Sequence, residues 1–380
     1  MIYLDYAATT PVLPEVAGAI REAMENHWGN PSSLHPIGQG AGRLLRQSRS
    51  RIAAALGVGP TEILFCSCGS EANNWALDGI LSAHPDVRTL ITSRLEHPSV
   101  FAKAEALAKE DPGLRLHFLP VSGEGRVLLD GLPDLLASGP ALVSLMLVNN
   151  ETGVLQPVAE AVAMARRAPH PVFVHVDAVQ ALGKLALDLK GLDADLVSFG
   201  GHKIGAPKGA AFLYKKPGLE LGRLIEGGGQ ELGLRGGTEN TPYLAGLAVA
   251  VERAVLEAPA FAQRCERLQA ILLEKLLAIP GVVLNGDPAG NSRAIVNFSV
   301  PGTQSDIMQI RLGDGGLCIS GGAACASGAR RPSRILLAMG LEAKRIESSL
   351  RVSFGPATTE AEVLDGARIL GEVAAAVRGA

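Results

Sequence analysis

The stretch Leu196-Val197-Ser198-Phe199-Gly200-Gly201-His202-Lys203 carries the pattern on which the fold prediction depends. It begins as a short apolar run, typical of a strand that is buried on both faces of a parallel sheet. It ends in two glycines and a lysine. A lysine at the end of a buried strand lies in a desolvated cleft, where its pKa falls and its neutral amine becomes nucleophilic. Lys203 is therefore a candidate for Schiff-base chemistry, and the alternative is an ordinary loop lysine.

Further short apolar segments alternate with helical patterns in the same part of the chain. The predicted strands are Ile63–Phe65, Thr89–Thr92, Ala141–Val148, Val172–Val176 and Ala210–Tyr214, and the predicted helices are Glu71–Ser82, Ser99–Glu110 and Val158–Ala168. This alternation predicts an α/β fold with a mainly parallel sheet between layers of helices. Ligands of such a fold bind at the carboxyl ends of the strands.

The pattern changes after about Thr241. The later segments are a long helical stretch over Pro242–Leu277, expected to break near Pro259, then strands at Ala294–Ser299 and Leu350–Phe354 and an amphipathic helix over Thr359–Arg378. We expect a second α/β domain here. The glycine clusters at 227–229 and 236–237 predict a functional or interfacial loop.

Composition excludes several classes of protein. The 380 residues are 47% hydrophobic, which predicts a large core. The formal net charge is −3, so we expect neither a nucleic acid nor an anionic membrane as partner. The N-terminus lacks a signal-peptide pattern, and the longest apolar run, Ala141–Val148, is far shorter than the ~20 residues of a membrane-spanning helix. Five scattered cysteines fit a reducing compartment. We expect a cytoplasmic protein that binds neither DNA nor membranes.

Asp177 and Gln180 follow the end of another buried strand, in His175-Val176-Asp177-Ala178-Val179-Gln180. Asp177 and Lys203 are thus predicted at one edge of the sheet. An aspartate there keeps a pyridine nitrogen protonated, which makes the ring of pyridoxal phosphate (PLP) an electron sink. Gln180 is placed to donate to the phenolic oxygen of that ring. The alternative for Asp177 alone is a helix N-cap.

Other strand ends supply groups that suit the rest of such a site. Ser67-Cys68-Gly69-Ser70-Glu71 opens a helix and offers backbone N–H groups to a phosphate, although any βα turn looks similar. His97 is placed to stack on a ring or move a proton, or else is structural. Asn149 ends a third strand. Arg351 presents a planar fork to a carboxylate, or forms a surface ion pair.

Cys325 is the best candidate for a nucleophilic thiol. Glycines flank it in Gly321-Gly322-Ala323-Ala324-Cys325-Ala326-Ser327-Gly328, whereas Cys265 and Cys318 lie in apolar, structural patterns. Cys66 and Cys68 lack a second cysteine pair or a histidine pattern at zinc spacing, so we expect small core-packing residues there and no metal site.

Together these motifs resemble the PLP-dependent cysteine desulfurases of the NifS/IscS type, within the class-V aminotransferase-like proteins of PLP fold type I. The resemblance covers nearly the whole chain, from Tyr3-Leu4-Asp5-Tyr6-Ala7-Ala8-Thr9-Thr10 to Arg351. It implies a large PLP-binding domain, residues 13–256, with a mainly parallel seven-stranded sheet flanked by helices. Residues 1–12 and 257–380 would form a smaller α/β domain carrying the loop of Cys325.

The resemblance also implies a role for each candidate residue. Lys203 would bind PLP covalently, His97 would stack on the ring and move protons, and Asp177 would pair with the pyridine nitrogen. Gln180 and Asn149 would contact the cofactor, and Asn149 and Arg351 the substrate. The implied phosphate ligands are Gly69, Ser70, His202 and, from the other subunit of a homodimer, the partner subunit's Thr238.

The implied reaction converts L-cysteine to L-alanine and leaves the sulfur on Cys325 as a persulfide. Sulfur would then pass to acceptor proteins, such as an iron–sulfur scaffold or a sulfur carrier, for cluster assembly and tRNA thiolation. Alternatives with the same fold are a selenocysteine lyase and another PLP-dependent aminotransferase or lyase; a non-catalytic binding module is a third. Gly200 departs from the pattern, because the family usually has a serine there, so one phosphate hydrogen bond is missing.

Overall fold

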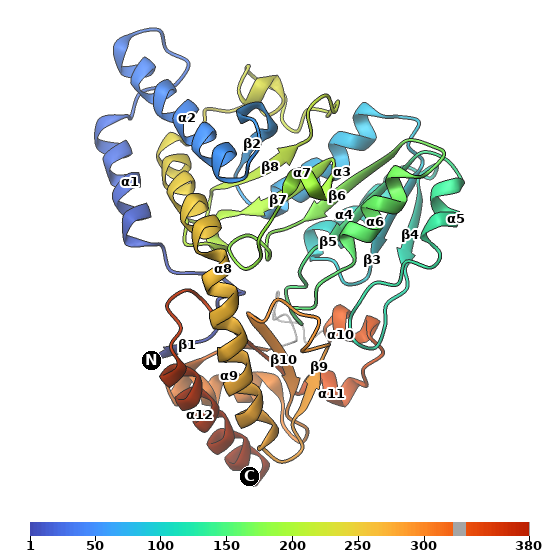
Figure 1. The fold of residues 1–380 in the computed structure, drawn as a ribbon, viewed down its shortest axis with the longest axis vertical. Helices are drawn as coiled ribbons and strands as arrows, with labels where there is room; N and C mark the ends of the chain where they lie inside the picture. The colour runs from blue at the N-terminus through green and yellow to red at the C-terminus, as the bar shows by residue number, and fades with distance from the viewer. Residues whose placement is uncertain (322–331, 380) are drawn as a thin grey trace.

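The computed structural model describes residues 1–321 and 332–379, so the predicted nucleophile Cys325 lies outside the described residues. The larger part of the molecule is built around a seven-stranded sheet with strand order β2-β8-β7-β6-β5-β3-β4 (Figure 1). Its strands are β2 (Ile63–Cys66), β3 (Thr89–Ser93), β4 (Arg115–Leu119), β5 (Ala141–Met146), β6 (Val172–Asp177), β7 (Leu196–Gly200) and β8 (Ala211–Lys215). Only β8 is antiparallel to its neighbours β2 and β7. The predicted mainly parallel α/β sheet is confirmed.

The sheet has a hydrophobic core on each face. Successive side chains of a strand point to opposite faces, so they pack alternately in the two cores. Leu90 and Leu142 belong to one core, and Ile91 and Val143 to the other. The helices around this sheet are α1 (Pro14–Asn26), α2 (Pro36–Ala55), α3 (Gly69–Ala83), α4 (Pro98–Glu110), α5 (Leu132–Ala137), α6 (Val158–Arg166) and α7 (Leu189–Leu192). Burial on both faces explains why the strands lack a polar alternation.

A separate core lies in the lower part of Figure 1. It is built on the antiparallel sheet β12 (Ser320–Gly321), β13 (Ser349–Ser353), β10 (Ile295–Ser299) and β9 (Val283–Asn285), and on the parallel pair β1 (Ile2–Tyr3) and β11 (Leu317–Cys318). Its helices are α9 (Ser305–Asp314) and α12 (Glu360–Gly379). Two short helices, α10 (Arg334–Ala338) and α11 (Ala343–Glu347), instead place Leu336 and Ile346 in the core of the large sheet. Leu4 packs in this core with Phe261 and Phe298, which supports our proposal that residues 1–12 and 257–380 form the smaller domain.

Helix α8 (Thr241–Leu277) joins the two parts of the molecule (Figure 1). The predicted break near Pro259 is wrong, since the helix continues through this residue. A proline inside a helix loses one backbone hydrogen bond. Here the residues on either side are fixed by burial, Val251 in the core of the large sheet and Cys265 in the smaller core, so packing outweighs that loss. Among the described residues, no helix has the length and apolarity to cross a membrane.

The segment 4–10, which we call the N-terminal arm, connects the smaller sheet to the end of β7. Its Ala7 N–H donates to Ser353 Oγ at 2.8 Å, and Ser353 N–H donates to the Leu4 carbonyl at 2.8 Å. On the other side, Thr10 Oγ1 donates to the His202 carbonyl at 2.9 Å. The arm therefore holds the loop after β7 against the smaller domain.

Replacing Leu77 tests the packing of α3 on the sheet. Leu77 is fully buried, so Leu77→Ala should lower the free energy of unfolding by about 2–5 kcal/mol through lost burial and the cavity left behind. Leu256→Ala, on α8 at 82% exposure, is the matched control and should stay within about 0.5 kcal/mol. If urea unfolding showed the same loss of free energy for both variants, the packing of Leu77 between α3 and the sheet would be contradicted.

Candidate active site

Lys203 ends a short 3-10 turn, Gly201–Lys203, directly after β7. Its amine donates to the carbonyl oxygens of Ala7 at 2.6 Å and Ala8 at 2.7 Å, both in the N-terminal arm. Burial, together with the positive charges of Lys184 and Arg351, lowers the pKa of Lys203 to about 7. A large share of the amine is therefore neutral near pH 7, as nucleophilic attack on an aldehyde requires.

Position 201 has no room for a side chain, because other segments of the same chain approach it closely. A Cβ at this position would lie 2.6 Å from the Ala210 carbonyl oxygen and 2.8 Å from Leu247 Cδ1. Both neighbours are buried and fixed by the sheet and by α8. A larger residue at Gly201 would displace the turn that carries Lys203.

Asp177 closes β6 at the same edge of the sheet and is 5% exposed. Its Oδ1 accepts the Val179 N–H at 3.0 Å, and its Oδ2 accepts the side-chain amide of Asn73 at 2.7 Å. Asn73, on α3, was not found from the sequence, because nothing in its local pattern separates it from other polar helix residues. Its amide also donates to Ser99 Oγ at 2.9 Å, so it links Asp177 to the start of α4.

His97 is the N-cap of α4 and lies beside this network. Its Nδ1 accepts the Ser99 N–H at 3.2 Å and lies 2.7 Å from Ser99 Oγ. Because a backbone N–H only donates, the neutral ring carries its proton on Nε2. Burial is the main cause of the lowered pKa of His97. The negative charge of Asp177 raises this pKa, and the positive charges of Lys203 and Arg334 lower it. The neutral ring is thus the stable form near pH 7.

Two of the predicted phosphate residues, Gly69 and Ser70, open helix α3. Gly69 is the first residue of this 15-residue helix, and a Cβ there would lie 2.8 Å from Val179 Cγ2. A Cβ built on Gly200 would lie 3.9 Å from the Gly69 nitrogen, so Gly200 borders the same space, and the Ser70 side chain is exposed. Burial lowers the pKa of His202 to about 4, and its Nδ1 lies 3.2 Å from Thr9 Oγ1. Small residues at a helix N-terminus fit a phosphate group.

The two cysteines before this helix differ in their surroundings. Cys66 is buried in β2, and burial raises the pKa of its thiol well above the usual value. Cys68 is exposed and is the N-cap of α3, where its sulfur accepts the Glu71 N–H at 3.4 Å. The predicted core-packing role fits Cys66 and is wrong for Cys68, because an N-cap side chain turns toward the helix end.

Arg351 lies on β13 with its side chain 10% exposed, so the alternative of a surface ion pair is wrong. Its Nη2 donates to Asp5 Oδ1 at 2.8 Å, and its Nη1 donates to the Asn150 carbonyl at 2.8 Å. Its buried Nε has no hydrogen-bond partner among the described residues. A buried guanidinium with an unused donor is suited to a carboxylate ligand.

Asn149 and Thr238 are placed differently from the other candidates. The Asn149 oxygen accepts the N–H groups of Glu151 and Thr152 at 2.9 Å, and its amide nitrogen donates to the Leu95 carbonyl at 3.0 Å. These bonds fix the turn after β5, and contact with a cofactor or substrate stays a prediction. Thr238 is exposed and lines a separate cavity of about 580 Å³ with Ser67. Its predicted role in the partner's site also stays a prediction.

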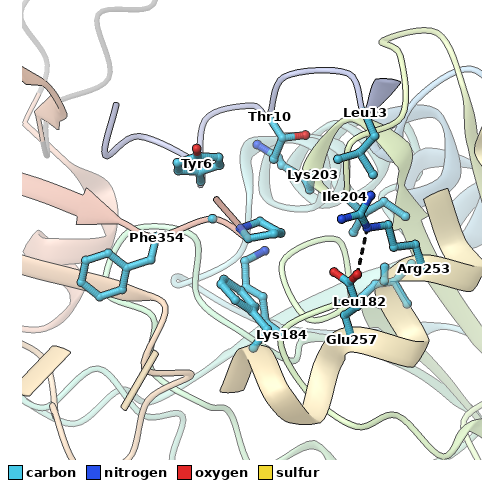
Figure 2. A pocket seen from close by; sticks show the side chains of 15 residues that line it. Tyr6, Thr10, Leu13, Leu182, Lys184, Lys203, Ile204, Arg253, Glu257 and Phe354 are labelled. Atoms are coloured by element: carbon cyan, nitrogen blue, oxygen red, sulfur yellow. Dashed lines mark hydrogen bonds and ion pairs between the residues drawn. The ribbon is translucent and has the colours of Figure 1, made fainter. Parts of the chain in front are cut away.

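A cavity of about 500 Å³ lies where the N-terminal arm and both domains meet (Figure 2). Lys184 and Lys203 line it from the large domain, Tyr6 from the arm and Phe354 from the smaller domain. Figure 2 shows the Lys184 amine pointing into this space. The sequence did not single out Lys184, which follows β6 by seven residues and is 4% exposed.

Comparisons with known proteins agree with this geometry. The family model described as aminotransferase class-V matches residues 2–365. A cysteine desulfurase of Trichormus azollae is 39% identical over 96% of this chain and 90% of its own length. The cysteine desulfurase IscS of Clostridium botulinum is 37% identical over 95% of this chain and 91% of its own length.

Solved structures give the same result for the fold. A NifS-like protein superposes with a TM-score of 0.91 at 33% identity and covers 98% of both chains. SspA in complex with cysteine has a TM-score of 0.81 at 31% identity, over 94% of this chain and 100% of its own. The seven-stranded architecture is thus that of the NifS-like PLP proteins.

The lowered pKa of Lys203 predicts the pH dependence of its reactivity. Without added PLP, trace acylation of Lys203 should rise through a midpoint near pH 7, because the neutral fraction of the amine rises there. Digestion and mass spectrometry would follow the peptide, with exposed Lys190 as reference in the same sample. A midpoint near 10.4, the ordinary value for lysine, would contradict the burial described here.

Proposed function

This chain belongs to the class-V aminotransferase family, and on that premise we propose that it is a PLP-dependent cysteine desulfurase that converts L-cysteine to L-alanine. The observation that carries the proposal is the placement of a weakly basic Lys203 amine at a sheet edge shared with Asp177. His97 faces the same network through Asn73 and Ser99. This is the set of groups that a pyridine aldehyde requires.

The residues present fit PLP. Bound PLP supplies an electron sink for a carbanion at the substrate Cα. Lys203 would hold its aldehyde carbon, Asp177 its pyridine nitrogen and Gln180 its phenolic oxygen. Gly69, Ser70 and His202 would hold the phosphate, where the glycine leaves space and the N-terminus of α3 offers N–H groups. Asn73 keeps the Asp177 carboxylate oriented, since it donates to Oδ2 at 2.7 Å.

Three groups would act on the substrate itself. The unused Nε of Arg351 would bind the carboxylate of L-cysteine, and Asn149 would contact the substrate beside it. Asp5 orients the guanidinium, because it accepts from Nη2 at 2.8 Å and is itself fixed by Ser320 Oγ at 2.8 Å. His97 would hold a proton at Nε2 and transfer it during the reaction.

Cys325 would take up the sulfur. Its thiolate would attack the sulfur atom of bound L-cysteine, so that an S–S bond forms on the enzyme while the C–S bond of the substrate breaks. The electron pair of that bond stays on the carbon, which is protonated to give L-alanine. The outer sulfur of the persulfide would pass to an iron–sulfur scaffold or a sulfur-carrier protein, for cluster assembly and tRNA thiolation.

We further propose a cytoplasmic homodimer in which the partner subunit's Thr238 completes the phosphate site. The exposed position of Thr238 in this chain leaves it accessible to a second copy. The cysteines of the described residues, Cys66, Cys68, Cys265 and Cys318, are free thiols, which supports a reducing compartment.

Cys325→Ala tests the function directly. The variant should keep the yellow absorbance of lysine-bound PLP, yet release L-alanine from L-cysteine at least roughly 100-fold more slowly, because the sulfur acceptor is lost. Cys318→Ala is the control and should keep the wild-type rate. Wild-type alanine release by Cys325→Ala, or a wild-type protein that consumes L-selenocysteine or a keto acid instead of L-cysteine, would count against the proposal.

Gly200→Ser tests the phosphate site. Its hydroxyl would add a donor next to the Gly69 nitrogen and tighten PLP binding by about tenfold, the effect of one charge-assisted hydrogen bond. Gly200→Ala is the control, because it adds the same Cβ, 3.2 Å from Val179 Cγ1, without a hydroxyl. Equal PLP dissociation constants for the serine and alanine variants would show that no phosphate lies within reach of residue 200.

A further inference from the structure

Lys184 is a buried cation that the reaction outlined above does not use. It is 4% exposed, and its one hydrogen bond among the described residues runs from Nζ to Gln180 Oε1 over 3.2 Å. Burial lowers its pKa to about 8, so the ammonium form still prevails at pH 7. A buried ammonium is costly, and its position next to a cofactor residue calls for an explanation.

The other end of the Gln180 amide faces the catalytic lysine. Gln180 Nε2 donates to the Ala7 carbonyl oxygen at 2.9 Å, and the same oxygen accepts from Lys203 Nζ at 2.6 Å. A flipped amide would set its oxygen against the Ala7 oxygen and its NH₂ group against the Lys184 ammonium. Lysine has donors only, so it tolerates one of the two orientations.

None of the charged groups around Lys184 accepts a hydrogen bond from it in the described part of the chain, so its acceptor is the Gln180 amide oxygen. Lys203, which is only partly protonated near pH 7, lines the same cavity and offers no negative charge. Arg253 on α8 is paired with Glu257 at 3.0 Å and with Glu15. Cys265, also on α8, is a neutral thiol, since burial raises its pKa to about 12. No ion pair of Lys184 with a carboxylate occurs in the described part of the chain.

We propose that Lys184 is a positioning residue for the PLP site: its ammonium holds the Gln180 amide with the NH₂ group turned toward Ala7 and Lys203. In this orientation Gln180 presents a donor, not an acceptor, to the phenolic oxygen of PLP. The inference rests on the proposed function for the identity of that ligand.

A double-mutant cycle with Lys184→Met and Gln180→Ala tests the inference. Each single variant should bind PLP about tenfold more weakly by absorbance titration, because each removes the oriented donor. The double variant should bind no more weakly than Gln180→Ala. Lys184→Gln, which retains a donor to Oε1, should recover most of the affinity. Lys190→Met repeats the change on an exposed lysine and should bind as the wild type does.

Two results would overturn the inference. One is a Lys184→Met variant that binds PLP like the wild type. The other is a loss of affinity that persists in full in the Gln180→Ala background, as a general structural role would give. If Lys184→Met does not fold, Lys184→Ala takes its place in the cycle. Wild-type protein that binds no PLP at Lys203 would instead refute the proposed function and this inference together, whereas normal wild-type binding with an unaffected Lys184→Met refutes the inference alone.

Discussion

The site depends on one constraint, the burial of the Lys203 amine against the carbonyl oxygens of Ala7 and Ala8. Burial disfavours the charged form of a lysine, and the positive charges of Lys184 and Arg351 act in the same direction. The two carbonyl oxygens accept hydrogen bonds from the amine at 2.6 and 2.7 Å. The N-terminal arm thus shields a reactive nitrogen and fixes its position at the end of β7.

The same arm connects the cofactor side of the site to the substrate side. Ala7 bonds to Gln180 and Lys203 through its carbonyl oxygen and to Ser353 through its N–H. Two residues earlier, Asp5 orients Arg351 on the smaller sheet. Backbone and side chains of one short segment therefore set the distance between the group that would hold the cofactor and the group that would hold a substrate carboxylate. A change in this segment would alter both functions at once.

The sequence predicted the sheet well because its signals are local. Buried strands such as Val172–Asp177 are short apolar runs with polar residues at their carboxyl ends, and those ends meet at one sheet edge. The edge strand Arg115–Leu119 was missed, since its half-buried residues give a weaker pattern. The break expected at Pro259 was wrong, because burial in two cores outweighs one lost hydrogen bond. Asn73 and the Asp5–Arg351 pair depend on contacts between distant segments, which no local pattern encodes.

The central claim is that the Lys203 amine forms the covalent link to PLP. The direct measurement is borohydride reduction of the PLP-loaded protein, followed by digestion and mass spectrometry of every lysine peptide. A reduced pyridoxyl group is expected on Lys203 and none on Lys184, a buried lysine that lines the same cavity. A pyridoxyl group on Lys184 or another lysine, or no pyridoxyl group on any lysine, would contradict this role of Lys203.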